Sequence, residues 1–303
     1  MRGLFVQIAG GMIVPIIEVR DLTHVYSAGT PFEKVALDHI NLSIESGEFV
    51  GVIGHTGSGK STLIQQFNGL LKPTSGEILV DGRNIWEEKK QMRRLRFDVG
   101  LVFQYPEYQL FEETVYKDIA FGPKNMGLDE EEIDRRVRDA AGFAGISEEM
   151  LGKSPFELSG GQKRRAAIAG VIAMDPKVLI LDEPTAGLDP KGRDRILGRI
   201  KEYHQTKKNT ILLVSHSMED VAKFATKVLV MNKAKVFTYG TVDEVFSKSE
   251  TISHMGLSIP QISKVFHALS DKGLNVERNV YTVERAKEEI LNRLSKGQRQ
   301  EHA

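Results

Sequence analysis

The sequence predicts an α/β fold with a mostly parallel core sheet, and three observations lead to this fold class. Continuous runs of Val, Ile and Leu recur up to about residue 240, which is typical of parallel strands buried on both faces. Amphipathic helical stretches separate these runs and indicate βαβ units. One run leads into a glycine-rich segment and then a helical stretch, "GHTGSGKSTLIQQFNGLL", which is a strand–loop–helix order typical of α/β proteins.

The expected strands follow the chain in order. Residues 1–13 are expected to form an extension before the first strand, and either Met1 or Met12 could be the start. Two alternating segments, "IIEVRDLTHVY" and "VALDHINLSIESGE", predict an antiparallel subsheet. The apolar runs expected as core strands are residues 48–54, 99–103, 177–184, 210–216 and 227–232.

Helices are expected to dominate two further parts of the chain. A charged helical subdomain, about residues 105–165, is inserted into a main domain of residues 14–240. A small, mostly helical C-terminal domain, residues 241–303, begins at a capping box of Thr241 and Glu244 and is expected to serve dimerisation. Its apolar residues recur at helical spacing in two stripes: Ile262, Val265, Phe266 and Leu269, then Val283, Ile290, Leu291 and Leu294.

Composition excludes several classes of protein. The 303 residues are 41% hydrophobic and 27% charged, which is ordinary for a globular protein. Lys+Arg and Asp+Glu both number 41, so no cationic field indicates a nucleic-acid partner, and we expect none. The absence of Cys excludes disulfides and thiolate metal sites. No apolar run approaches the roughly 20 residues that a membrane-spanning helix needs.

The glycine-rich segment fits G-x-x-x-x-G-K-[ST], the Walker A pattern, in the strand–loop–helix context that this motif requires. Glycines let backbone N–H groups converge on phosphate oxygens at a helix N-terminus. Lys60 is expected to reach the β- and γ-phosphates of ATP, and Ser61 to ligate Mg²⁺. The alternative is a glycine-rich turn with a surface lysine. The expected ATP-binding residues are Gly54, His55, Thr56, Gly57, Ser58, Gly59, Lys60, Ser61 and Thr62.

Two carboxylates and a histidine follow apolar strands. Asp182 and Glu183 end the run 177–184, and ligands of open α/β sheets bind outside the carboxyl ends of strands. Asp182 is expected to hold Mg²⁺ through its hydration shell. Glu183 is expected to orient the attacking water or accept its proton. His216 ends another strand and would contact the γ-phosphate and hold Glu183 in register. The alternative for the two carboxylates is a solvated strand end, and the alternative for His216 is a purely structural role.

The segment "ELSGGQKRRAAIAG" contains a second glycine motif. Ser159 and Gln162 fit a capping box, so the simplest interpretation is a well-capped helix. That interpretation leaves Gly160 and Gly161 unexplained, since each costs about 1 kcal/mol of helix propensity relative to Ala. Glycines allow close approach, and a bare helix N-terminus attracts anions. We therefore expect these residues to face an ATP held by a partner molecule.

The order "GHTGSGKS", "LSGGQ", "LILDEP" resembles the ATPase subunits of ABC transporters over about residues 16–240. In that family two nucleotide-binding domains close head to tail over two ATPs. The resemblance implies that Tyr26 stacks on adenine and that Gln104 touches Mg²⁺ and the attacking water. It also implies that Asp189 crosses the dimer interface and that His216 is the switch histidine. ATP hydrolysis to ADP and phosphate, coupled to transport across a membrane, is the implied activity.

One branch of the family is more similar than the others. "QYPEYQLFEETVYKDIAFGPKNMG", "FNGLLKPTSG" and "SPFELSGGQKRRAAIAGVIAMDP" resemble the ATP-binding A components of energy-coupling factor (ECF) importers of vitamins and transition metals, and among these the second of two paralogous A components. The resemblance implies pairing with a second ATPase subunit, either a paralogue or a copy of this chain. It also implies docking on a transmembrane T component, with a membrane S component binding the cargo, at the cytoplasmic face of a prokaryotic cell membrane.

The apolar segment after Gln104 is unusual for a loop. The ECF resemblance implies that it seats a coupling helix of the T component, whereas the alternative is that Leu110 and Phe111 only pack the helical subdomain. Three other functions also stay open: the ATPase of another ABC transporter, an ATPase acting on DNA, and a binding module without turnover. The DNA-acting ATPase would need a long coiled coil that this chain lacks. The residues expected to dock are Tyr105, Pro106, Tyr108, Leu110 and Phe111.

Overall fold

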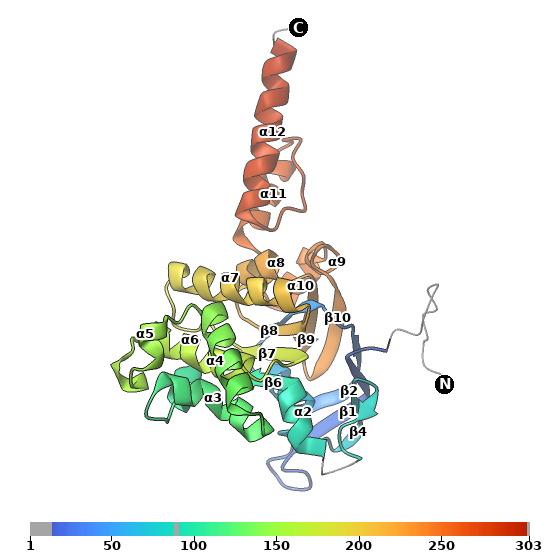
Figure 1. Ribbon diagram of the computed structural model, residues 1–303. Helices are drawn as coiled ribbons and strands as arrows, with labels where there is room; N and C mark the ends of the chain where they lie inside the picture. Colours follow the sequence, from blue (N-terminus) through green and yellow to red (C-terminus); the bar gives the residue numbers. More distant parts are fainter. Residues whose placement is uncertain (1–13, 88–90, 302–303) are drawn as a thin grey trace.

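A computed structural model describes residues 14–87 and 91–301, so the expected extension 1–13 lies outside the described residues. Its centre is a six-stranded sheet in the order β10-β9-β3-β8-β7-β6 (Figure 1). All neighbours in this sheet are parallel except β9 and β10. The mostly parallel core sheet is therefore confirmed. Its strands are β3 (Phe49–Gly54), β6 (Val99–Val102), β7 (Val178–Asp182), β8 (Thr210–Val214), β9 (Lys227–Asn232) and β10 (Lys235–Thr241).

A second sheet of four strands is antiparallel, in the order β2-β1-β4-β5. The antiparallel subsheet expected from the two alternating segments is confirmed, because these segments form β1 and β2. Two further strands were not expected from the sequence: β4 pairs with the opposite edge of β1, and β5 pairs with β4. The strands are β1 (Ile17–Tyr26), β2 (Lys34–Ile44), β4 (Ser75–Val80) and β5 (Arg83–Asn84).

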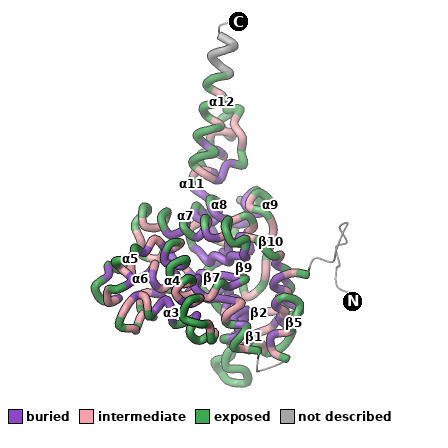
Figure 2. The backbone as a smooth tube through the Cα atoms, viewed as in Figure 1, coloured by how far each residue is buried: buried purple, intermediate pink, exposed green. Residues whose placement is uncertain are grey.

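Both faces of the core sheet are buried, as Figure 2 shows for its centre. The side chains of β7 alternate between two hydrophobic clusters, since successive residues of a strand point to opposite faces. Leu179 and Leu181 pack with α7 (Pro190–Lys207) and with the helical subdomain. Val178 and Ile180 pack with α1 (Lys60–Phe67), α2 (Met92–Asp98) and the antiparallel sheet. This double covering explains why the core strands are continuously apolar.

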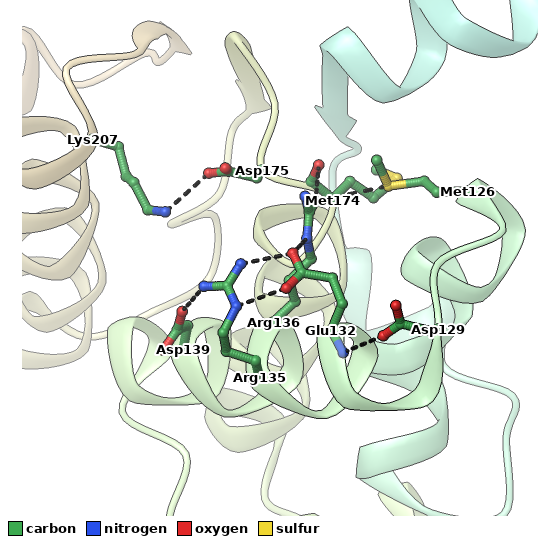
Figure 3. A network of polar contacts seen from close by, with 9 residues as sticks. All are labelled: Met126, Asp129, Glu132, Arg135, Arg136, Asp139, Met174, Asp175 and Lys207. Atoms are coloured by element: carbon green, nitrogen blue, oxygen red, sulfur yellow. Dashed lines mark hydrogen bonds and ion pairs between the residues drawn. The ribbon is translucent and has the colours of Figure 1, made fainter.

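The middle of the chain is helical, as expected. Figure 3 shows a polar network that ties α4 to its surroundings. Glu132 accepts hydrogen bonds from Arg135 and Arg136 at 2.7 Å, and Arg136 also donates to the Met174 carbonyl at 3.0 Å. Arg136 thus joins α4 to the turn after α6. The helices here are η2 (Pro106–Gln109), α3 (Val115–Met126), α4 (Glu130–Ala144), α5 (Glu148–Leu151), η3 (Pro155–Glu157) and α6 (Gly160–Ile172).

The C-terminal segment is helical, but it does not separate from the main body at residue 240. Phe246 and Ile252 share one buried cluster with Ile53 of β3 and with α8 (Met218–Phe224). Beyond this cluster, α11 and α12 extend away from the body side by side (Figure 1) around a small core that includes Phe266 and Val280. The segment comprises α9 (Val242–Phe246), α10 (Ser249–His254), α11 (Gln261–Asp271) and α12 (Val283–Glu301).

The two apolar stripes expected in this segment differ in burial. In the first stripe Phe266 is buried, whereas Val265 is exposed. The second stripe lies on α12 and is exposed at all four positions: Val283, Ile290, Leu291 and Leu294. Within residues 14–87 and 91–301, no helix combines the length and the apolarity that crossing a membrane requires.

Candidate functional site

The glycine-rich loop lies between β3 and α1, as the motif predicts: Gly54 ends β3, residues 55–59 form the loop, and residues 60–62 start α1. The Lys60 ammonium folds back over the loop and donates to the carbonyls of Gly54 at 2.7 Å and His55 at 3.0 Å. Burial lowers the pKa of Lys60, and the charges of Glu183 and Asp182 partly oppose this. A desolvated ammonium beside loop backbone is a suitable partner for a phosphate.

Gly59 shows why the loop needs glycine. Its φ of 106° lies in the left-handed region that side chains disfavour. A Cβ at this position would also lie 2.5 Å from the Ala36 carbonyl oxygen of β2. The loop therefore packs against the antiparallel sheet through bare backbone at the entrance to α1.

Asp182 ends β7, and its side chain is buried beside the loop, with 8% of the residue exposed. Burial and the neighbouring charge of Glu183 raise its pKa, against a hydrogen bond with Ser61 and the charge of Lys60. Mg²⁺ prefers oxygen ligands, and this place offers the Asp182 carboxylate and the Ser61 hydroxyl, next to the carboxylate of Glu183. Asp182 and Ser61 therefore fit the metal ion that the motif implies.

Two of the predicted catalytic residues, Gln104 and His216, converge on the carboxylate of a third, Glu183. Glu183 Oε2 accepts a hydrogen bond from Gln104 Nε2 at 3.1 Å, and Glu183 Oε1 lies 2.8 Å from His216 Nε2. Gln104 follows β6, Glu183 follows β7 and His216 follows β8, three adjacent parallel strands. Their carboxyl ends therefore meet at one edge of the sheet, as open α/β folds require of a ligand site.

The backbone of Glu183 is unusual. Its φ is 50°, a left-handed conformation that is costly for a residue with a side chain. The Glu183 amide donates to the Val214 carbonyl of β8 at 3.0 Å, and its own carbonyl accepts from the Ala186 amide at 3.1 Å. The sheet and a tight turn thus hold Glu183 with its carboxylate at the sheet edge.

The second glycine motif forms the exposed start of α6. Ser159 and Gln162 make the expected capping box: Oε1 of the Gln162 side chain accepts from the Ser159 backbone amide at 2.8 Å. The Ser159 hydroxyl accepts from the Gln162 amide at a long 3.4 Å and keeps its own proton to donate. An added Cβ at Gly160 or Gly161 would meet no atom of the described chain within 4 Å. This helix start is therefore open to a second molecule.

Tyr26 and Asp189 lie at the periphery of the site. Tyr26 is 39% exposed, and its hydroxyl lies 3.2 Å from Thr62 Oγ1 at the start of α1, so its ring borders the loop. Asp189 caps α7 by accepting from the Gly192 amide at 2.6 Å. This cap explains the aspartate at position 189 from within the chain, with no need for a partner subunit. The expected contact of Asp189 across an interface stays a prediction.

The segment after Gln104 is less exposed than the sequence suggested. Pro106 is buried at the start of η2, and Leu110 packs against the cluster of the helical subdomain. Pro106 therefore offers no free surface, which is a correction to the expected docking set, and Leu110 is only partly exposed. Tyr105, Tyr108 and Phe111 are 44%, 84% and 62% exposed, and Phe111 packs edge-on against the exposed Phe121.

Two contacts near the site were missed in the sequence. The His55 ring contacts the Met255 carbonyl, so the phosphate loop touches the C-terminal segment. Arg164 forms a buried ion pair with Glu107. The sequence did hold a signal for the burial of Arg164, though not for its partner, because Arg164 falls on the helical stripe that continues with Ile168 and Ile172.

Comparison with known proteins shows the family of this chain. The family model described as ABC transporter matches residues 37–186. The energy-coupling factor transporter ATP-binding protein EcfA2 of Clostridium tetani is 59% identical over 276 residues, 91% of this chain and 96% of the relative. The chain belongs to the ABC transporter ATP-binding proteins, in the energy-coupling factor branch. EcfA2 of Caldanaerobacter subterraneus subsp. tengcongensis is 58% identical over 275 residues, again 91% of this chain and 96% of the relative.

Solved structures of ABC ATPases share the fold. CbiO1 from Clostridium perfringens, described as part of the ABC transporter complex cbiONQ, matches with a TM-score of 0.72 and 43% identity, covering 84% of this chain and 99% of that one. The ATP-binding cassette MJ0796, in a dimeric post-hydrolysis state bound to ADP and Pi, matches with a TM-score of 0.66 and 27% identity, covering 75% of this chain and 98% of that one. The resemblance to ABC ATPases of the ECF branch is thereby confirmed.

Proposed function

We propose that this ECF-branch ATPase hydrolyses ATP with Glu183 as the residue that orients the attacking water and takes its proton. The observation that carries the proposal is the Glu183 carboxylate, bridged between Gln104 and His216 beside the phosphate loop. With both oxygens held, the carboxylate has a fixed direction, and positioning is most of what phosphoryl transfer demands of a protein. Lys60, already desolvated, would exchange its loop carbonyls for the β- and γ-phosphates of ATP.

Mg²⁺ is the proposed cofactor, held by Ser61 and by Asp182 through water, with Gln104 close to it. The raised pKa of Asp182 supports this, because a nearby cation would stabilise its buried carboxylate. When bound, the ion would neutralise charge that develops on the phosphate oxygens. Lys60 and the loop N–H groups supply the remaining positive charge from the protein.

A two-site dimer with a second ATPase subunit, a paralogue or a copy of this chain, is the proposed assembly. The MJ0796 cassette is dimeric, and the open glycines of α6 leave room for a partner's γ-phosphate. Ser159 would donate its free hydroxyl proton to that phosphate, while Asp189 would lie at the interface. The exposed stripe of α12 would add a second dimer contact. ATP binding would close the dimer, and hydrolysis would open it again.

Import of a vitamin or transition metal is the proposed outcome of this cycle. The relatives are energy-coupling factor transporter proteins, and CbiO1 is part of a transporter complex. The chain would therefore work at the cytoplasmic face of the membrane, bound to a transmembrane T component and only indirectly to the cargo-binding S component. Tyr105, Tyr108 and Phe111 are the proposed seat for a helix of the T component, because exposed apolar groups close to the catalytic glutamine mark an interaction surface.

The hydrolytic role is tested by Glu183→Gln, which keeps the volume of the side chain and removes its base. We expect ATP affinity to stay within about twofold, while kcat falls at least about 100-fold, the lower end of what a general base contributes. Glu149→Gln is the control, because it changes an exposed glutamate of α5 that pairs only with Lys153 in the described chain. Equal turnover in wild type and Glu183→Gln would refute the role of Glu183.

Docking is tested separately with Tyr108→Asp. We expect this variant to hydrolyse ATP but to lose the membrane subunits during purification of the complex, because a carboxylate would be buried under the coupling helix. Phe32→Asp is a matched control, since Phe32 is also 84% exposed but lies in the turn between β1 and β2. Retention of the membrane subunits by Tyr108→Asp would contradict the proposed seat.

A further inference from the structure

Arg164 is a cation on the buried face of the signature helix α6. It shares this face with Ile168 and Ile172, and only 4% of the residue is exposed. A charge in such a place must be paired and hydrogen-bonded, because an unpaired buried charge is strongly unfavourable. The role of Arg164 therefore follows from the groups that its guanidinium contacts.

All three nitrogens of the guanidinium are occupied. Arg164 Nε donates to Glu107 Oε2 at 2.9 Å and Nη2 donates to Glu107 Oε1 at 2.5 Å, which is a bidentate pair. Nη1 donates to the carbonyls of Ala186 at 2.6 Å and Pro184 at 3.3 Å. Burial acts to raise the pKa of Glu107, but the hydrogen bonds and charge of Arg164 outweigh it and the pKa is lowered, so the pair is ionised at neutral pH.

These partners belong to different parts of the proposed site. Glu107 follows Gln104 by three residues, within η2. Pro184 and Ala186 form the turn directly after Glu183, and the Ala186 amide closes that turn on the Glu183 carbonyl. One side chain of the signature helix thus holds the segment of the glutamine and the turn of the glutamate together.

We propose that Arg164 is a positioning residue for ATP hydrolysis. By fixing the turn after Glu183 to the segment after Gln104, it keeps the Glu183 carboxylate aligned with Gln104 and His216 while Glu183 stays at its unfavourable φ of 50°. It also makes the start of α6, which faces the partner, move with that turn. This inference rests on the proposed role of Glu183. Lysine could not replace Arg164, since an ammonium cannot make a planar bidentate pair and hold two carbonyls at once.

Arg164→Lys in the full-length protein tests the proposal. We expect kcat to fall about 10- to 100-fold, in line with the cost of misplacing a reacting group by about 1 Å. We expect the KM for ATP and the affinity for a fluorescent ATP analogue to stay within about twofold, because the phosphate loop and Tyr26 are untouched. Arg138→Lys is the control: Arg138 also contacts two carboxylates, Asp134 and Glu148, but on the exposed face of α4. Its kcat should match that of wild type.

A double variant separates positioning from general stability. If Arg164 acts through Glu183, adding Arg164→Lys to Glu183→Gln should cause no further loss of the residual single-turnover rate. A further loss by the same factor as in wild type would overturn the proposal, as would an Arg164→Lys variant with unchanged kcat. If Glu183→Gln alone hydrolyses ATP normally, the proposed function fails instead, and the two failures are distinguishable.

Glu107→Gln provides a second variant in case Arg164→Lys does not fold, as judged by thermal unfolding. It keeps the volume of the side chain and leaves both carbonyl contacts of Arg164 in place. The same drop in kcat at constant KM is expected, with a smaller factor than for Arg164→Lys. A Glu107→Gln variant with normal kcat, or one that loses ATP affinity in proportion to kcat, would contradict the positioning role.

Discussion

Replacing Gly160 by Ala should stabilise the isolated protein and yet abolish its turnover. An added Cβ at Gly160 meets no atom of the described chain within 4 Å, so the monomer offers no steric objection. Alanine is favoured over glycine by about 1 kcal/mol in a helix interior, and by about half of that at the first residue of α6. A gain of about 0.5 kcal/mol corresponds to an increase in melting temperature of about 1 °C for a chain of this size.

The effect on turnover should have the opposite sign. In the proposed dimer the start of α6 lies against the partner's γ-phosphate, and a methyl group there would push the backbone N–H groups away. Loss of one such donor typically lowers kcat about 10²- to 10³-fold, or about 2.7–4 kcal/mol. Stability and activity therefore change in opposite directions only if Gly160 serves the partner rather than the fold.

Thermal unfolding without nucleotide and ATPase assays at saturating ATP measure the two effects. Dimer formation with ATP, followed by gel filtration in a Glu183→Gln background, shows whether closure is lost. Gly198→Ala is the matched control, because Gly198 lies in α7 and an added Cβ there also meets no described atom within 4 Å. It should stabilise the protein without affecting turnover. Normal turnover by Gly160→Ala, or a lower melting temperature than wild type, would refute the reasoning.

Three further predictions concern charge and packing. Asp182→Asn should raise the melting temperature at pH 7.5 and abolish Mg²⁺-dependent hydrolysis. Because the pKa of Asp182 is raised in the folded protein, the native state loses stability as the pH rises through that pKa, and Asn removes this loss. The stabilising effect of Asn should therefore vanish in acid, below the pKa of Asp182 in the unfolded chain. The contacts with Arg135 and Arg136 lower the pKa of Glu132 from 4.5 to about 2, so they stabilise the fold above this pH range and are lost as the pH falls through it. Glu132→Gln should therefore lose less melting temperature than wild type between pH 4.5 and about 2. Tyr203→Phe should keep or raise the free energy of unfolding in urea, since the buried hydroxyl has no hydrogen-bond partner among the described residues. Tyr203→Ala should instead lower it by about 3–5 kcal/mol.

The core strands were predictable because both their faces are buried. The strand β7 is continuously apolar from Val178 to Leu181, and its neighbours in sequence are helices, so a parallel sheet is the consistent solution. The short strands β4 and β5 and the antiparallel edge strand β10 carry weaker patterns, because each has one exposed face or too few residues. The packing of the C-terminal segment on the main body was hidden for a related reason: the apolar residues of α9 and α10 do not reveal whether they pack on each other or on Ile53.

The candidate site was predictable where chemistry requires a particular residue at a particular strand end. Lys60, Glu183 and His216 lie where their motifs place them, because carboxyl ends of parallel strands meet at one edge. The burial of Pro106 was not predictable, since an apolar loop residue packs inward or stays exposed according to long-range contacts. The partner of Arg164 was equally hidden, because Glu107 lies 57 residues away in the chain.

The site contains several arrangements that cost free energy in the absence of nucleotide, and this explains how the rest of the fold is built around it. Glu183 occupies a left-handed conformation, Asp182 is a buried carboxylate with a raised pKa, and the Lys60 ammonium is desolvated. A residue in a sparsely populated backbone conformation costs about 1–3 kcal/mol and persists only where the surroundings over-determine it. Here the central strands of a sheet covered on both faces determine where the three residues lie, and Arg164 holds the turn that follows Glu183. ATP with Mg²⁺ would relieve the two buried charges at once, so the same arrangements that weaken the empty protein favour the loaded one.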